Sequence, residues 1–170
     1  TKAAWEVNHP GDPITSVILD ANYWNPSDKW DSTWERSEQT IGYHAEVTAL
    51  MVDGDRSNPQ KTTSPRSTDP IGRAGSAFVA ALDLGTPVTV TLGHATPGKP
   101  KLAEVSSQPI STLIGQMLPM SDNTLAETIA RVISKESGGG GTAVSLNSII
   151  PGALVNLGFN TTGVTIRDGS

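Results

Sequence analysis

The sequence predicts an α+β protein in which a strand-rich part, residues 1–107, is followed by a helix-rich part, residues 108–170. Before residue 107, short β-branched and aromatic segments alternate with clusters of Gly, Pro, Asn and Asp, as is typical of strands joined by turns. After that point, apolar residues recur three and four positions apart over long segments, which indicates helices. A chain of 170 residues is long enough to bury a core, as one domain or as two small lobes.

Several segments have the composition of strands. The first, residues 14–24, follows a Gly-Asp-Pro turn and is rich in Val, Ile and aromatic side chains. The second, residues 45–53, ends at the turn-forming sequence DGDRSNPQ. Residues 87–93 and 101–107 flank the Gly/Pro-rich sequence HATPGKP, and we expect them to form a hairpin with a long turn. A last short strand is expected over residues 164–168.

A polar segment with aromatic side chains, residues 25–43, separates the first two expected strands. We predict a long ordered loop here, because Trp30, Trp34 and Tyr43 can each bury a large area and pin the loop to the domain. Stacking against a ligand is the alternative role for these rings. It is less favoured, since a protein has few binding pockets.

A helix with clear boundary signals follows. Asp69 is a favourable N-cap, Pro70 suits the first helical position, and the pattern stops at Gly85. The spacing predicts a single apolar face on this helix, formed by Ile71, Ala74, Phe78, Ala81 and Leu82.

Three helices are expected in the last third of the chain, over residues 110–118, 123–136 and 142–159. The glycine run at residues 138–141 separates the last two. A phosphate-binding role for this run is disfavoured, because no strand precedes it and no Lys-Ser/Thr follows, so we predict a helix–helix connector. The middle helix is expected to be anchored by its apolar positions, Leu125, Ala126, Ile129, Val132 and Ile133.

The composition excludes several classes of function. The net charge of −5 and the lack of a Lys/Arg run argue against a nucleic-acid partner, because phosphates require a basic face. The chain has no cysteine, which rules out thiolate metal sites and thiol catalysis within it. No apolar run approaches the roughly 18 residues that cross a bilayer, so no transmembrane segment is expected in this chain. The chain starts without Met and stops within a turn-forming sequence, and we expect it to be part of a longer protein.

No metal or other cofactor is predicted. The spacing of Asp53, Asp55 and Ser57 imitates the start of a calcium-binding loop, but Asn58 stands where that loop needs Gly, and Ser64 stands where it needs Glu. A tight turn is therefore the favoured structure for this segment. The histidines are far apart, and we expect them at the surface or at helix ends rather than around a metal: His9, His44 and His94.

The tripeptide Ser121-Asp122-Asn123 precedes the middle of the three late helices and has two interpretations. These residue types bond free backbone N–H groups at helix starts, and Thr124 to Glu127 has the spacing of a capping box. The second interpretation is an active site. Side chains two positions apart in a turn or extended segment point to the same side, so Ser121 and Asn123 would face one cleft while Asp122 points back into the protein. Such a pair offers a hydroxyl that can pass a proton and an amide that can hold a carbonyl group.

The sequence around this tripeptide reads SSQPISTLIGQMLPMSDNTLAETIARVIS. A Ser-x-Pro and a short helix lead into Ser-Asp-Asn, and Ala126-Glu127 follows three residues later. Further along are LVNLGF and TIRDGS, and earlier are SVILDANYW and GYHAEVTALMVDGD. In order and spacing, these elements resemble the S13 family of D-Ala-D-Ala carboxypeptidases, the penicillin-binding protein 4 type. The resemblance covers residues 14–170.

The resemblance implies a strand-rich accessory second domain, residues 1–107, followed by part of a β-lactamase/transpeptidase-like catalytic domain, residues 108–170. It implies a serine-type D-Ala-D-Ala carboxypeptidase or endopeptidase that acts on peptidoglycan stem peptides through an acyl-enzyme, and that β-lactams acylate. The setting would be extracytoplasmic, in the bacterial cell envelope. By the same resemblance, Ser121 would relay a proton to the departing D-Ala amine and Asn123 would hold the substrate's side amide, while Asp122 would have a structural role.

Two further elements of the family are missing from the chain. No serine has a lysine three positions on, so the nucleophile motif Ser-x-x-Lys is absent, and the nearest match to Lys-Thr-Gly, Lys61-Thr62-Thr63, lies on the wrong side of the tripeptide. We therefore expect a fragment that is inactive alone. Two alternatives stay open: a non-catalytic peptidoglycan-binding or scaffold domain derived from the same fold, and an unrelated α/β protein in which the tripeptide is only a helix cap.

Overall fold

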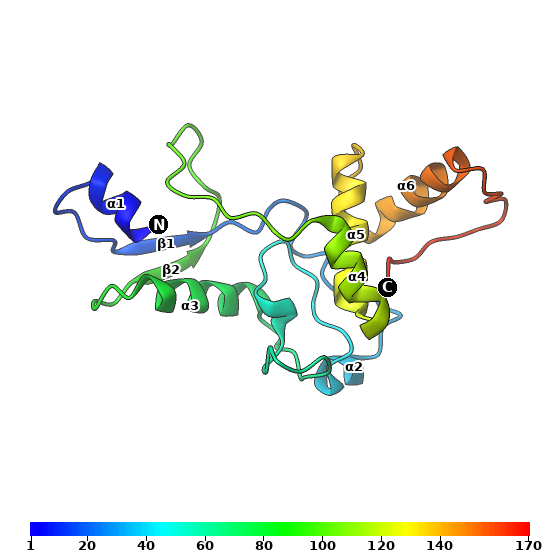
Figure 1. Ribbon diagram of the computed structural model, residues 1–170, viewed down its shortest axis with the longest axis horizontal. Helices are drawn as coiled ribbons and strands as arrows, with labels where there is room; N and C mark the ends of the chain where they lie inside the picture. The colour runs from blue at the N-terminus through cyan, green and yellow to red at the C-terminus, as the bar shows by residue number, and fades with distance from the viewer.

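The computed structural model describes residues 1–170 and has helices and a small sheet, which confirms the predicted α+β class. One end of the molecule is formed by helix α1 and a two-stranded sheet with helix α3 beneath it, and the other end by helices α4, α5 and α6 (Figure 1). Loops, the short helix α2 and a 3₁₀ turn connect the two ends. The helices are α1 (Lys2–Asn8), α2 (Arg36–Ile41), α3 (Pro70–Leu82), α4 (Ile110–Met120), α5 (Asn123–Glu136) and α6 (Ala143–Asn156).

The sheet consists of two parallel strands, β1 (Ser16–Leu19) and β2 (Thr89–Leu92), with Ser16 opposite Thr89 and Leu19 opposite Leu92. Parallel strands need a long crossover, and α3 lies within it. The predicted hairpin is therefore wrong: residues 101–107 form no strand and are almost entirely exposed. The pairing partner of β2 lies some seventy residues earlier in the chain, where local turn chemistry gives no signal.

Helix α3 begins as predicted, and it ends shortly before the predicted stop at Gly85. The Asp69 carboxylate accepts a hydrogen bond from the N–H of Gly72 at 2.9 Å, and Pro70 occupies the first turn. The helix ends at Leu82, where Asp83 takes a left-handed conformation with φ 47°. Its apolar face is buried only in part, because Ala74 and Leu82 are covered while Phe78 is 41% exposed.

The segment predicted as a second strand, residues 45–53, is buried over residues 45–48, but it is not a strand. Residues 44–48 are all covered, yet none forms a ladder with another strand. Instead, the N–H of Val47 donates to the carbonyl of Lys29 at 2.8 Å, and the N–H of Ala45 donates to the hydroxyl of Thr124 at 3.0 Å. The apolar pattern here reflects burial against α5 rather than sheet pairing. The expected strand over residues 164–168 is also absent.

The loop between these segments is ordered by its aromatic side chains, as predicted, although it also contains α2. The Trp30 and Trp34 rings contact each other edge to face, with centroids 5.4 Å apart. Tyr43 takes no such role, because it is 53% exposed. His44 stacks on Trp34 at 3.7 Å and is only 1% exposed, so its predicted surface position is wrong. The imidazole of His44 packs as a further flat ring in this aromatic cluster. The position of His44 in the sequence, far from the other histidines, did not indicate this packing.

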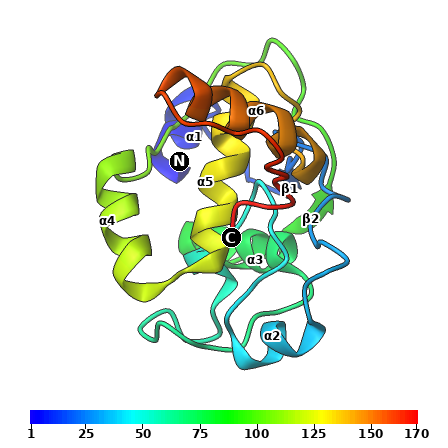
Figure 2. The same ribbon diagram turned by 90° about the vertical axis from the view of Figure 1, so that its right-hand side faces the viewer.

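The three late helices and their glycine connector are confirmed. Helix α5 contacts both α4 and α6, and residues 138–141 join α5 to α6 (Figure 2). Segments from the first part of the chain also contact α5, and the division of the chain at residue 107 stays a prediction. The tight turn expected near Asp53 is present as the 3₁₀ turn Asp53–Asp55. No helix combines the length and the apolar character that crossing a membrane requires.

Candidate active site

The tripeptide Ser121-Asp122-Asn123 forms the joint between α4 and α5. Ser121 ends α4 in a left-handed conformation, φ 51° and ψ 48°, and Asn123 is the first residue of α5. Asp122 is the N-cap of α5: its carboxylate accepts a hydrogen bond from the N–H of Leu125 at 3.0 Å. The predicted capping box of Thr124 and Glu127 is therefore wrong, because both residues lie inside the helix and bond elsewhere.

The three side chains of the tripeptide divide into two groups. Only that of Asp122 makes hydrogen bonds within the chain, to Leu125 and to the guanidinium of Arg56. The side chains of Ser121 and Asn123 make no such bonds; all three residues line the same two cavities, of about 160 and about 170 Å³. The catalytic role of Ser121 and Asn123 stays a prediction.

The first of these cavities lies between the tripeptide and an earlier part of the chain. Its wall opposite the tripeptide is formed by Gly42, Tyr43, Thr62, Thr63 and Arg66. A Cβ atom at Gly42 would lie 2.2 Å from the carbonyl oxygen of Ser64, and its φ is 107°, so only glycine fits this wall. Most of the wall comes from loops, whose positions depend on side-chain bonds.

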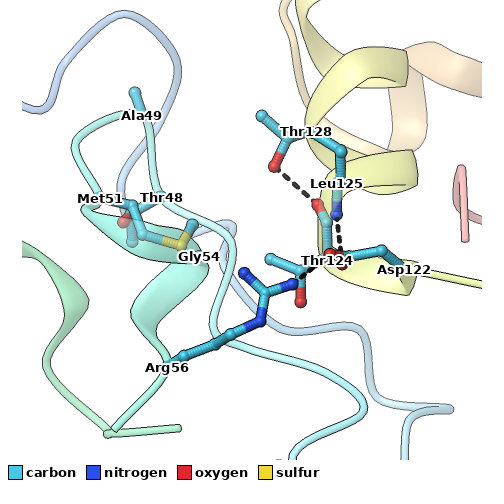
Figure 3. A pocket seen from close by; sticks show the side chains of 9 residues that line it. All are labelled: Thr48, Ala49, Met51, Gly54, Arg56, Asp122, Thr124, Leu125 and Thr128. Carbon is cyan, nitrogen blue, oxygen red and sulfur yellow. Dashed lines mark hydrogen bonds and ion pairs between the residues drawn. The ribbon is translucent and has the colours of Figure 1, made fainter. Parts of the chain in front are cut away.

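A larger cavity of about 230 Å³ lies on the Asp122 side of the joint and contains neither Ser121 nor Asn123. Figure 3 shows the Arg56 side chain crossing this cavity to Asp122 at the start of α5, with Met51 on the opposite wall. Both partners are largely covered, with 19% of the Arg56 side chain and 12% of the Asp122 side chain exposed. The middle residue of the tripeptide is thus held by an ion pair from the early part of the chain.

Two arginines give this region its positive charge. The Arg66 guanidinium donates to the carbonyl of Gly42 at 3.0 Å and to that of Ser64 at 3.1 Å. Burial lowers the pKa of Arg66 to about 10, and the nearby charge of Arg56 adds to this effect, while Asp122 and Asp55 oppose it. Arg66 is still protonated at neutral pH. The arginines thus stabilise an arrangement of loop carbonyls and carboxylates around the joint.

The buried face of α5 is largely polar. Among the expected apolar anchors only Ile129 is buried, and Ile133 is 46% exposed. A stripe at helical spacing is buried instead, formed by Thr124, Glu127, Arg131 and Ser134. The carboxylate of Glu127 accepts from the Nε of Arg131 at 2.6 Å, and Arg131 also donates to the carbonyl of Asp28. These bonds attach loops of the early chain to the helix that carries Asn123.

Sequence reasoning missed Arg56 and Arg131, which hold the joint and its helix. The signal for Arg131 was present, because Glu127 lies four residues before it, the spacing of a helical ion pair. For Arg56 no local signal exists, since its partner is sixty-six residues away.

Sequence comparisons place the chain among known proteins. The D-Ala-D-Ala carboxypeptidase 3 (S13) family matches residues 55–170. The chain is 30% identical over 166 residues to carboxypeptidase DacB of Mycolicibacterium smegmatis, a match that covers 97% of this chain and 36% of that protein. It is 32% identical over 129 residues to carboxypeptidase Rv3627c of Mycobacterium tuberculosis, covering 76% of this chain and 28% of that protein. The chain thus spans about a third of the length of these relatives, and by these matches it belongs to the S13 family of D-Ala-D-Ala carboxypeptidases.

Proposed function

We propose that the intact protein is a serine-type D-Ala-D-Ala carboxypeptidase that acts on peptidoglycan stem peptides, with Ser121 and Asn123 in its active site. One observation carries the proposal: Ser121 and Asn123 line the same cavities and their side chains make no hydrogen bond within the chain, while Asp122, which also lines these cavities, bonds to the start of α5 and to Arg56. This arrangement suits a site in which two side chains are free to contact a substrate and the third holds them in place.

In the proposed reaction, a serine outside these 170 residues attacks the carbonyl carbon of the penultimate D-Ala. The peptide bond to the terminal D-Ala breaks, and an ester to the serine forms. Ser121 passes a proton to the departing amine of D-Ala, and Asn123 bonds the side amide of the substrate. Water then hydrolyses the ester and releases the shortened peptide. Penicillins acylate the same serine, and the substrate implies an extracytoplasmic setting in the cell envelope.

The family membership and the names of the two relatives support the carboxypeptidase activity. Hydrolysis of a cross-linking peptide bond is a variant of the same chemistry, so endopeptidase activity belongs to the same proposal. Because the chain has no Ser-x-x-Lys, we infer that it is inactive alone.

The test is release of D-Ala from a synthetic peptide ending in D-Ala-D-Ala by the intact protein. We expect Ser121→Ala to lower kcat by roughly a hundredfold, the size typical of a lost proton-transfer group. Asn123→Ala should lower kcat and also raise KM, because it removes a contact to the bound peptide. Wild-type kcat in Ser121→Ala, or no D-Ala release by the wild-type protein, would contradict the proposal.

A further inference from the structure

The C-terminal turn of the chain, Asp168-Gly169-Ser170, lies against α5 in both views of the molecule (Figures 1 and 2). The indole of Trp34 donates to one oxygen of Asp168 at 2.9 Å. The other oxygen accepts from the backbone N–H of Ser170 at 3.0 Å and from its hydroxyl at 2.9 Å. The turn is thus closed on itself and tied to the aromatic loop.

Glu127 holds the middle of this turn. One of its carboxylate oxygens accepts the N–H of Gly169, and the other accepts the Nε of Arg131 at 2.6 Å. Both Glu127 and Arg131 are 0% exposed. A buried carboxylate is costly unless it is paired, so the Glu127 side chain has little freedom to move, and the turn bonds to a fixed acceptor.

Gly169 touches the surface of α5 directly. A Cβ atom at this position would lie 2.3 Å from the Cβ of Ala130 and 3.3 Å from the carbonyl oxygen of Ala126. The first distance is far below any normal contact between carbon atoms. Any residue larger than glycine at position 169 must therefore move the turn away from the helix, unless Ala130 is made smaller.

This close approach brings Ser170 to the tripeptide. Ser170, Ser121 and Asn123 line the same cavity of about 170 Å³, together with residues of α4 and α5. The hydroxyl proton of Ser170 is used on Asp168, so its oxygen keeps lone pairs that can accept a hydrogen bond. An amide N–H of a peptide is a donor of the right kind.

We propose that the turn of residues 168–170 is a wall of the substrate cleft, in which Ser170 accepts a hydrogen bond from the stem peptide and Glu127 is the positioning residue. The inference rests on the proposed function and adds to it a contact for the peptide substrate. Glu127 acts only through Gly169, by setting the distance between Ser170 and the pair Ser121 and Asn123.

The test uses the intact protein and measures kcat and KM for a peptide ending in D-Ala-D-Ala, with urea unfolding alongside. Gly169→Ala should raise KM about tenfold or more, because even a small displacement of a group that positions the substrate has a large kinetic effect. Adding Ala130→Gly removes the clashing methyl group and should restore KM to within about threefold of the wild-type value. Ala130→Gly alone and Gly152→Ala are the matched controls, since a Cβ at Gly152 meets nothing, and both should keep the wild-type KM.

Ser170→Ala keeps the inference testable if Gly169→Ala does not fold. Ser170 is exposed, so this variant should unfold like the wild type, while KM rises about fivefold with the loss of one hydrogen bond. An unchanged KM in Ser170→Ala, or a Gly169→Ala defect that Ala130→Gly fails to rescue, would overturn the inference while leaving the proposed function intact. A wild-type protein that releases no D-Ala would overturn both.

Discussion

The ion pair between Arg56 and Asp122 should contribute measurably to the stability of the protein. Its two side chains are 19% and 12% exposed, which places the pair between exposed pairs, worth less than about 1 kcal/mol, and fully buried ones, whose breakage costs about 3–5 kcal/mol. We therefore expect a coupling free energy of about 2 kcal/mol between the two side chains. The bond ties the middle of the tripeptide to the early part of the chain, so this value also measures how firmly the joint is held.

A double-mutant cycle with Arg56→Met and Asp122→Asn measures this coupling in urea unfolding of the intact protein. Asparagine still caps α5 by accepting the N–H of Leu125, so the cycle isolates the charge pair from the cap. The Lys101–Glu104 pair is the control, because its side chains are 68% and 65% exposed and its coupling should be below about 0.5 kcal/mol. Equal coupling in the two cycles would refute the reasoning.

Two further predictions concern stability. Burial of the His44 ring against Trp34 lowers its pKa, so the unfolded state binds this proton first, and stability should fall as the pH drops below about 6.5. His44→Phe keeps a ring on Trp34, and its free energy of unfolding in urea should fall less between pH 7 and pH 5 than that of the wild type. An equal fall in the two proteins would mean that other groups cause the pH dependence. Gly42→Ala should destabilise the protein by about 3 kcal/mol, because its Cβ would lie 2.2 Å from the Ser64 carbonyl oxygen at a φ of 107°. Gly115→Ala, whose Cβ meets nothing, should not destabilise it, and equal unfolding midpoints for the two variants would contradict the account.

Helices α3, α4, α5 and α6 could be predicted from the sequence because their signals are local, whereas α1 and α2 were not predicted. Asp69 caps α3 and Pro70 is its first residue, so both signals lie at the start of the helix. The late helices repeat their spacing of apolar residues over several turns. The strands β1 and β2 also lie within predicted strand segments, but their pairing could not be predicted, since they pair across a crossover of about seventy residues. The segment 45–53 has the composition of a strand and is buried over residues 45–48, but burial alone does not supply a pairing partner.

For the candidate site, the sequence predicted the functional side chains but not the residues that hold them in place. Ser121 and Asn123 follow from the tripeptide and its resemblance to the family, but the groups that hold it come from distant positions. Arg56 reaches Asp122 from a loop, and the polar stripe of α5 binds loop backbone that has no regular structure. A helix can bury a polar face against the backbone of loops, and a search for apolar faces does not detect such a helix.

The central claim is that Ser121 and Asn123 assist a nucleophile that lies outside these 170 residues. The time course of acylation by a fluorescent penicillin tests it, with the intact protein, its Ser121→Ala variant and the 170-residue chain side by side. The account predicts rapid label on the intact protein, label slowed by roughly a hundredfold on Ser121→Ala, and none on the chain alone. Covalent label on the chain alone, or an unchanged rate in Ser121→Ala, would contradict it.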